Sequence, residues 1–286
     1  MPSLIDIRRR IRSVKNTQQI TKAMKMVSAA KLRRAQDRVI SARPYGAMLR
    51  KMLGNLAAAA AADENAGSNP LLAQRPERRI LLVLVTSDKG LAGAFNTNLN
   101  KAAQRFAAER GDASVRMVLI GRKGRDFFRK RGASVVSEHI NMASKLVYAD
   151  VAGIAGKAME LYRKEEIDAV YLIYNEFKSV AAQTLLTSRV LPIRMPEQAS
   201  AADYIFEQPP VAILDALLPR YVETEFYRAL AESTAAEHAA RMTAMEAATS
   251  NAGEMIEKLT LYMNRVRQAS ITKEIIEVVS GAAAAE

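Results

Sequence analysis

The chain has 286 residues, 49% of them hydrophobic, and no cysteine. This composition is typical of a folded protein of one large or two small domains, and it excludes disulfides, thiolate metal sites and thiol-based regulation. The net charge of +12 is concentrated in residues 1–51, which hold 14 basic side chains and only two acidic ones, Asp6 and Asp37. Such asymmetry indicates a nucleic acid, a membrane surface or an acidic protein as partner, and composition alone ranks nucleic acid first.

Membrane insertion and secretion are not expected from the sequence. No stretch holds 18 uninterrupted apolar residues, the length that a membrane-spanning helix needs. The first residues lack the basic and then apolar layout of a signal peptide or the features of a transit peptide. We therefore expect the chain to work in a reducing cellular interior.

The first segment reads as a long helix. Residues 3–43 contain neither proline nor glycine, and Ser3 and Asp6 have the spacing of a capping box at a helix start. Pro44 and Gly46 are expected to bend or interrupt this helix without ending it. The apolar stripe predicted to face a partner consists of Leu4, Ile7, Ile11 and Val14 and then, after a shift, of Ile20, Met24 and Val27.

After the first segment the residue pattern changes from a long helical pattern to short apolar runs that alternate with helical stretches. This change predicts an α/β body in the middle of the chain. Residues 63–79 are rich in turn formers and read as a linker. Strands are predicted at 80–85, 115–120, 169–174, 183–191 and 203–207. Helices are predicted between them, at 97–110, 125–131 and 149–165. This alternation favours a Rossmann-like body with a mainly parallel sheet.

The last segment reads as a second long helix. It has no proline after Pro219, and Ala252, Ile256, Leu259, Met263 and Val266 form a heptad seam. A 3.5-residue period predicts a left-handed supercoil, and the N-terminal helix is the expected mate in a long antiparallel coiled coil. The predicted division is 1–62, N-terminal coiled-coil helix; 63–79, linker; 80–208, α/β globular domain; and 209–286, C-terminal coiled-coil helix.

Two glycine-containing turns follow predicted strands, at 86–93 and 121–124. Phosphates are often bound at such places, but neither turn matches a phosphate-binding consensus, and a structural turn is the favoured interpretation. His139 and His238, the only histidines, have no acidic neighbours that would make a metal site or a general base. We therefore predict no catalytic, cofactor-binding or metal-ligating residue, no cofactor and no enzyme activity of the chain itself.

The basic cluster near the N-terminus favours a protein partner. Arg8, Arg9, Arg10, Arg12 and Lys15 spread over much of the helix circumference, which also suits a solvated face. Nucleic-acid sites more often interleave basic with aromatic side chains, and Tyr45 is the only aromatic residue before residue 52. An acidic protein surface thus fits better than ordered nucleic acid.

Several long motifs resemble the gamma subunit of F-type ATP synthases, and they span essentially the whole chain in order. They are IRRRIRSVKNTQQITKAMKMVSAAKLRRAQ (residues 7–36), TSDKGLAGAFN (86–96), YNEFKS (174–179), ARMTAMEAATSNA (240–252) and RQASITKEIIE (267–277), followed by Gly281. The resemblance implies a central rotor shaft. It would couple proton-driven rotation of the c-ring to sequential changes in the beta subunits, which make ATP.

The resemblance also implies partners and contact residues. The partners would be the alpha and beta subunits of the alpha3-beta3 hexamer, the epsilon subunit and the c-ring, with no nucleic acid and with membrane association only through the complex. The residues that match hexamer-facing positions of the family are Met24, Arg241, Arg267, Gln268 and Thr272. Tyr204 and Glu207 match positions at the c-ring end. The expected location is peripheral, on the cytoplasmic side of a bacterial cell membrane.

Three other hypotheses stay open on the residues alone. A basic coiled-coil protein that binds nucleic acid would bind arbitrary duplex in a salt-sensitive manner. A homodimeric structural coiled coil would be a stable dimer by itself. A nucleotide-binding enzyme built on the α/β body would lose nucleotide binding when Gly90 or Gly93 is replaced.

Overall fold

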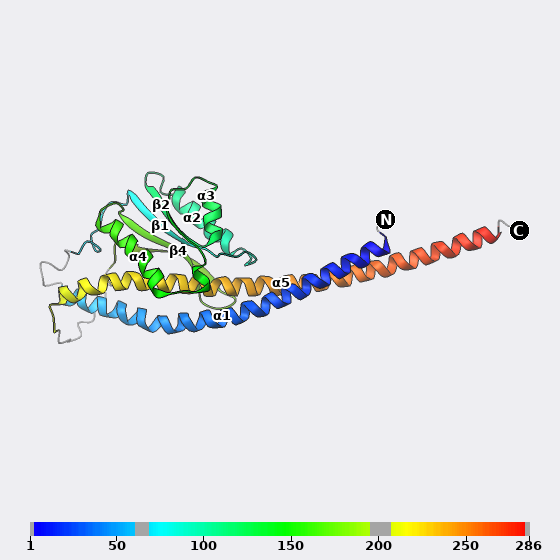
Figure 1. Ribbon diagram of the computed structural model, residues 1–286, viewed down its shortest axis with the longest axis horizontal. Coiled ribbons are helices and arrows are strands. Elements are labelled where there is room, and N and C mark those ends of the chain that lie inside the picture. Colours follow the sequence, from blue (N-terminus) through cyan, green and yellow to red (C-terminus); the bar gives the residue numbers. More distant parts are fainter. Residues whose placement is uncertain (1–2, 61–68, 195–206, 284–286) are drawn as a thin grey trace. The chain divides into compact units, whose positions relative to one another are not determined.

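A computed structural model describes residues 3–60, 69–194 and 207–283. Two helices, α1 (Leu4–Ala60) and α5 (Pro210–Ala283), enclose the other elements in the chain order (Figure 1). The chain divides into two compact units, residues 1–29 with 241–286 and residues 30–240. Each helix therefore contributes to both units. The domain boundaries near residues 62, 79 and 208 stay a prediction.

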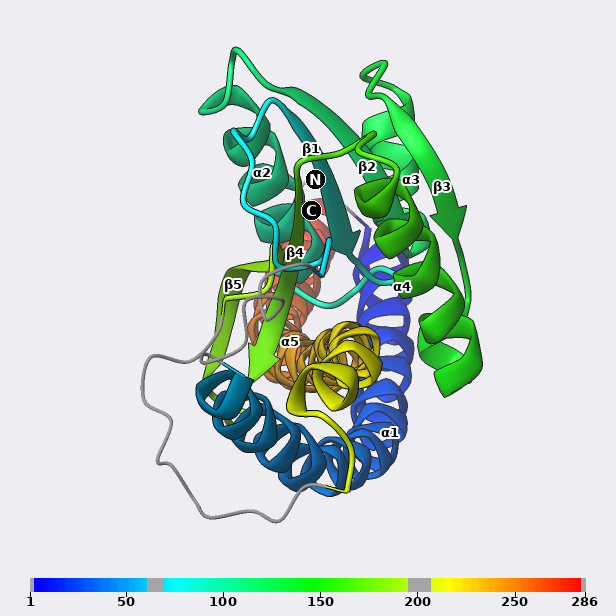
Figure 2. The same cartoon turned by 90° about the vertical axis from the view of Figure 1, so that its left-hand side faces the viewer.

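The second unit contains one five-stranded sheet. The strands are β1 (Arg79–Val85), β2 (Ser114–Ile120), β3 (Val135–His139), β4 (Ala169–Phe177) and β5 (Gln183–Leu191). Their order is β3-β2-β1-β4-β5 (Figure 2). All neighbours are parallel except β4 and β5, which run antiparallel. The prediction of a mainly parallel sheet is confirmed. The sequence reading missed β3, a short edge strand without a continuous apolar run, and the predicted strand at 203–207 lies outside the described residues except for Glu207.

Helices cover both faces of this sheet. They are α2 (Phe95–Ala108), α3 (Arg122–Arg129) and α4 (Tyr148–Arg163), with a short 3-10 turn at Met142–Ser144 before α4. Figure 1 shows α4 on the side of the sheet that faces α5, with α2 and α3 on the other side. Both faces of the sheet need cover because successive residues of β1 point to opposite faces. Leu81, Val83 and Val85 belong to a core cluster with α4 and α5, and the residues between them point to the other face.

The amino ends of β1 and β4 are joined by an ion pair between the half-exposed side chain of Arg79 and the buried carboxylate of Asp168. Asp168, just before β4, is 3% exposed and accepts hydrogen bonds from the Arg79 guanidinium at 2.7 and 3.2 Å and from the Arg79 backbone N–H at 2.8 Å. These hydrogen bonds lower the pKa of Asp168 more than burial raises it. The carboxylate is therefore charged in the folded protein at neutral pH and fixes the register of the two central strands.

Helix α1 begins at the predicted capping box. Ser3 Oγ donates to Asp6 Oδ2 at 2.8 Å, and the Asp6 backbone N–H donates to Ser3 Oγ at 3.2 Å. The hydrogen bonds from Ser3 lower the pKa of the Asp6 carboxyl. Helix α1 continues through Pro44 to Ala60, and α5 continues through Pro219, so neither proline ends its helix.

The buried positions of α1 keep one heptad spacing along the helix, which corrects the predicted shift of its apolar stripe. Ile20 and Val27 are 60% and 55% exposed, and the seam continues instead through Gln18, Thr21 and Lys25. The buried and half-buried positions with this spacing are Leu4, Ile7, Ile11, Val14, Gln18, Thr21, Lys25, Ser28, Leu32, Ala35, Val39, Ala42, Gly46, Leu49, Leu53 and Leu56. Further buried or half-buried positions lie beside them, at Met24, Ala29, Gln36, Gly54, Asn55 and Ala57. The prediction followed apolar residues, whereas the helix keeps its period and accepts polar side chains there.

The seam predicted on α5 is confirmed by burial. Ala252 is 8% exposed, and Ile256, Leu259, Met263 and Val266 are half-buried. In the first unit α1 and α5 run antiparallel, since Thr21 pairs with Thr249 and Lys25 with Glu246. In the second unit they are also antiparallel, since Arg43 pairs with Glu232 and Arg50 with Glu225. The terminal helices thus form the predicted coiled coil.

The ion pair at Asp168 generates a prediction on stability and pH. Asp168→Asn should lower the free energy of unfolding by about 1.5–3 kcal/mol at pH 7, because charged hydrogen bonds are lost from a buried site. The folded-state pKa is depressed, so this contribution is present above the unfolded pKa of about 3.9 and is lost as pH falls through the folded value.

Urea unfolding of both proteins between pH 3 and 7 measures this difference. The gap between wild type and variant should close toward acid pH. Glu160→Gln, which breaks an exposed ion pair with Lys164 on α4, is the matched control and should change little. A gap that stays constant down to pH 3 would contradict the assignment.

Candidate functional site

The carboxyl ends of the strands, where open α/β sheets usually bind ligands, are covered by α5. Leu230, Ser233, Thr234 and Glu237 of α5 line a cavity together with residues of the two turns that follow β1 and β2. The cavity measures about 10 Å³, whereas small-molecule sites are commonly ~300–1,000 Å³. This end of the sheet therefore holds a helix where related architectures hold a ligand.

The two turns also satisfy each other's polar groups. Helix α3 begins with three backbone N–H groups that all have acceptors on the first turn: Arg122 donates to Asp88 Oδ1, Lys123 to the Ser87 carbonyl and Gly124 to Thr86 Oγ1. A phosphate at a helix start would need such N–H groups free. The structural interpretation of both turns agrees with this geometry.

Gly121 is the residue that allows the turns to approach. Its φ is +95°, and a Cβ atom built there would lie 2.2 Å from the Thr86 carbonyl oxygen. Thr86, 5% exposed, donates its hydroxyl to the Ile120 carbonyl at 2.9 Å. The body thus carries a tightly bonded core at the strand ends and supports α5.

The exposed end of α5 is the most accessible part of the first unit. Figure 1 shows α5 continuing beyond the first residue of α1. Every side chain from Ile271 to Ser280 is exposed, including Ile275, Ile276 and Val279 at 58–62%. A helix end with exposed apolar side chains and no packing partner in the described part of the chain points to a protein environment.

The predicted hexamer-facing residues divide into two groups. Arg267, Gln268 and Thr272 are exposed on the free end of α5. Arg241 is 8% exposed on α5, where it interacts within the chain, and Met24 is half-buried on α1. The structure therefore gathers three of the five at one surface, while Arg241 has a packed environment of its own.

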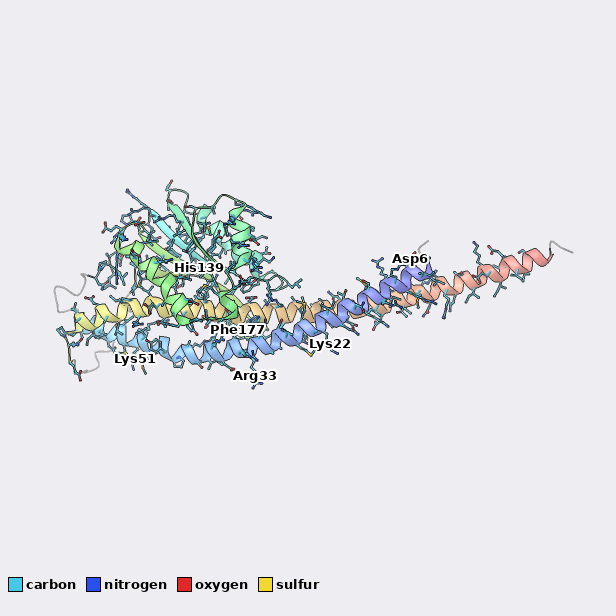
Figure 3. All side chains as sticks on the ribbon, viewed as in Figure 1. Asp6, Lys22, Arg33, Lys51, His139 and Phe177 are labelled. Carbon is cyan, nitrogen blue, oxygen red and sulfur yellow. The ribbon has the colours of Figure 1, made fainter. Side chains whose placement is uncertain are left out.

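The c-ring-end residues are described only in part. Glu207 is exposed and lies three residues before the start of α5. Tyr204 lies outside the described residues. The basic residues of the first segment, Arg8, Arg9, Arg10, Arg12 and Lys15, are all exposed on α1, as expected for a contact with acidic groups. Figure 3 shows Lys22 farther along the same helix.

The sequence reading missed a polar layer in the coiled coil of the first unit. The hydroxyl oxygens of Thr21 and Thr249 lie 2.7 Å apart, and Gln18 Nε2 donates to the Thr249 carbonyl at 3.4 Å. Lys25 Nζ lies 2.6 Å from Glu246 Oε1. A polar layer in an apolar seam fixes the register, because a slipped pairing would bury these groups without partners. The strict heptad spacing from Leu4 was the signal that could have revealed it.

A groove runs beside this polar layer. Its volume is about 850 Å³, and its lining includes Lys22 and Met26 of α1 and Glu254 and Glu257 of α5. Both signs of charge therefore face the groove. Among the described residues, no group of three or more potential metal ligands is found, and no helix is long and apolar enough to cross a membrane.

Comparisons with known proteins place these features in a family. A family model described as ATP synthase matches residues 3–285. The ATP synthase gamma chain of Solibacter usitatus (strain Ellin6076) is 74% identical over 286 residues, covering 100% of both chains. That of Anaeromyxobacter sp. (strain Fw109-5) is 51% identical over 289 residues, covering 99% of both chains.

Solved structures show the same fold. The central stalk and c-ring structure of the Tetrahymena thermophila mitochondrial ATP synthase contains a chain that is 25% identical, with a TM-score of 0.63, covering 80% of this chain and 99% of that one. A chain in the rotor of the Euglena gracilis mitochondrial ATP synthase is 19% identical, with a TM-score of 0.66, covering 94% and 98%. The second likeness supports the fold alone.

The turn at Gly121 generates a prediction on stability. Gly121→Ala should lower the free energy of unfolding by more than about 3 kcal/mol, because positive φ and a backbone clash are both costly. Gly153→Ala on α4, where a Cβ meets nothing within 4 Å, is the control and should raise it by about 0.5–1 kcal/mol. Chemical unfolding measures both changes, and equal effects would contradict this account of Gly121.

The polar layer also generates a prediction on stability, but here the substitution should not lower the free energy of unfolding. Replacing Thr21 and Thr249 together by valine should leave the free energy of unfolding unchanged or raise it by up to about 1 kcal/mol, since both partners are replaced by apolar groups of similar shape. Thr17→Val, at an exposed position outside the seam, is the control. Thermal unfolding followed by circular dichroism measures the change. A loss greater than about 1 kcal/mol would show that the pair stabilises the helices directly.

Proposed function

Since the chain belongs to the family of ATP synthase gamma chains, we propose that it is the central rotor shaft of such an enzyme and is not itself catalytic. Three features support this function. The terminal helices form a coiled coil, one of them ends in a free helix with exposed apolar side chains, and the α/β body uses its ligand-binding edge to hold α5. The covered sheet end is the observation that carries the non-catalytic role.

The shaft works through asymmetry. Rotation of the c-ring turns the chain, and the coiled coil presents a different side to each beta subunit in succession. The beta subunits then pass through their conformations in sequence and make ATP. The chain supplies geometry and stiffness, while the chemistry takes place in its partners.

We assign the contact residues according to whether they are exposed at the free end of α5 or packed along the coiled coil. Arg267, Gln268 and Thr272 contact the alpha3-beta3 hexamer from the free helix end, and Met24 and Arg241 contact it along the coiled coil. Tyr204 and Glu207 contact the c-ring end, where the epsilon subunit also binds the body. Residues 1–62 and 209–286 make the shaft, 63–79 the linker and 80–208 the body.

The basic segment supports a protein partner over nucleic acid. Its exposed arginines face outward from the seam, where acidic loops of the hexamer can pass close to them. Each such exposed pair contributes only ~0.2–1 kcal/mol and is screened by salt, which suits contacts that must form and break during rotation. The chain is held at the cytoplasmic face of a bacterial membrane through the complex alone.

Reconstitution tests the proposed function. The chain is mixed with matching alpha and beta subunits, the complex is isolated, and ATP hydrolysis is assayed. One copy per three alpha–beta pairs, with cooperative turnover at several sites, is the expected result. A chain that fails to co-purify, and that dimerises or binds DNA instead, would contradict the shaft function.

The free helix end generates a prediction on coupling. Arg267→Ala combined with Gln268→Ala should reduce ATP-driven proton pumping in the assembled enzyme, because both side chains are exposed and available to the hexamer. The thermal unfolding of the isolated variant should match wild type. Gln104→Ala with Arg105→Ala, the same residue types exposed on α2, is the control and should pump normally. Undiminished pumping in the first variant would contradict the assignment.

A further inference from the structure

The last residues of β4 extend beyond the neighbouring strand on one side. The pairing of β1 with β4 stops at Leu84 with Ile173, while β5 continues to pair with β4 as far as Phe177. On the β1 side the final residues of β4 therefore have no strand partner among the described residues. The N–H and C=O of one residue in a strand point to the same side, so each second residue has two polar groups to satisfy there.

Two side chains from the long helices satisfy both groups of Phe177. Its N–H donates to Glu232 Oε2 of α5 at 3.0 Å, and its carbonyl accepts from Arg43 Nη2 of α1 at 2.8 Å. Arg43 and Glu232 also bind each other, with Nη2 to Oε1 at 3.1 Å and Nε to Oε1 at 3.2 Å. Figure 3 shows Phe177 beside α5 at the edge of the body. One residue of β4 is thus bound through both of its backbone polar groups by side chains from both helices of the coiled coil.

The burial of this group makes its bonds hard to replace. The Glu232 side chain is 2% exposed and lies in a run of buried residues, Ala231–Glu237, while Arg43 is 48% exposed. Burial of a carboxylate is costly unless it is paired and fully hydrogen-bonded. Glu232 meets this condition through Arg43 and the Phe177 N–H, so its hydrogen bonds join α1, α5 and β4 at one buried position.

A second ion pair shows what a connection between the helices alone looks like. Arg50 of α1 lies 3.3 Å from Glu225 of α5, which also binds Arg228 at 2.7 Å. Arg50 is 52% exposed, close to the value for Arg43, and it has no hydrogen bond to a strand among the described residues. The main difference is therefore that Arg43 and its partner Glu232 also bind a strand of the sheet, whereas Arg50 and its partner Glu225 join only the two helices.

We infer that Arg43 and Glu232 fasten the free edge of β4 to α1 and α5, and that they carry load between the sheet and both helices while the shaft turns. This inference rests on the proposed function, because only a rotor transmits torque. In the chain, α1 precedes β1 and α5 follows β5, so each helix is joined along its length to the sheet by packing and side-chain bonds. Arg43 and Glu232 join α1, α5 and the sheet at Phe177. The pair therefore limits how far the two helices can rotate relative to the sheet when torque acts on the shaft. Both side chains are positioning residues and make no contact with a reacting group.

The whole enzyme in membrane vesicles provides the test. Arg43→Met, Glu232→Gln and the control Arg50→Met are each assembled with the other subunits, and proton pumping and ATP hydrolysis are measured in the same vesicles. Arg43→Met should lower the ratio of pumping to hydrolysis by about twofold or more, because it leaves a buried carboxylate without its charge partner. Glu232→Gln should lower the ratio less, since its amide oxygen still accepts from Phe177. Arg50→Met should keep the wild-type ratio.

Hydrogen exchange in the same complexes gives a readout that does not depend on pumping. The peptide that contains Phe177 should exchange faster in Arg43→Met than in wild type, and at the wild-type rate in Arg50→Met. If Glu232→Gln does not assemble, the half-exposed Arg43 site still decides the matter.

The outcomes separate the two proposals. A wild-type chain that neither assembles nor supports hydrolysis overturns the shaft function. A wild-type chain that pumps, with equal ratios in Arg43→Met and Arg50→Met or with unchanged exchange at Phe177, overturns only the load-bearing pair.

Discussion

The structure depends on the burial of α5 along much of its length. Most of the stability of a protein helix comes from packing of its apolar face, so the apolar positions of α5, a helix of 74 residues, need covering surfaces. In one unit α1 supplies this surface through a heptad seam. In the other, α1, the sheet and the turns after β1 and β2 surround it, and the run Ala231–Glu237 is buried on every side.

This requirement explains why α5 covers the place where such a sheet usually binds a ligand. The sheet order and the crossover helices are those of a doubly wound fold, in which the strand ends leave a crevice. Here α5 occupies that crevice, and Gly121 lets the two adjoining turns close on each other. In this chain, the strand ends of an architecture often associated with nucleotide binding pack against a helix. The fold by itself therefore says little about activity.

Most of the architecture could be predicted from the sequence because its signals are long. Continuous apolar runs predicted β1, β2 and β4, and heptad spacing predicted the seam of α5. The path of the α1 seam was predicted wrongly because the prediction followed the apolar residues Ile20 and Val27. The seam instead contains Thr21, which is buried, and Gln18 and Lys25, which are half-buried. The contact of Arg43 and Glu232 with Phe177 could not be predicted at all, since three separate elements meet only after folding. The hexamer-facing residues came from resemblance, and burial now separates Arg241 from the exposed group.

The free end of α5 has a thermodynamic consequence for the partner. The segment extends a helix that is already nucleated, so each added residue gains a hydrogen bond, but without packing this gain barely offsets the loss of backbone entropy. No other segment among the described residues packs against the side chains from Ile271 to Ser280. A hexamer that encloses this segment must therefore also stabilise its helical state, and part of the association energy is spent on order. This coupling lowers the net affinity between the free end of α5 and the hexamer, while the enclosed segment keeps a defined helical conformation. A low affinity favours rotation of the shaft inside the hexamer.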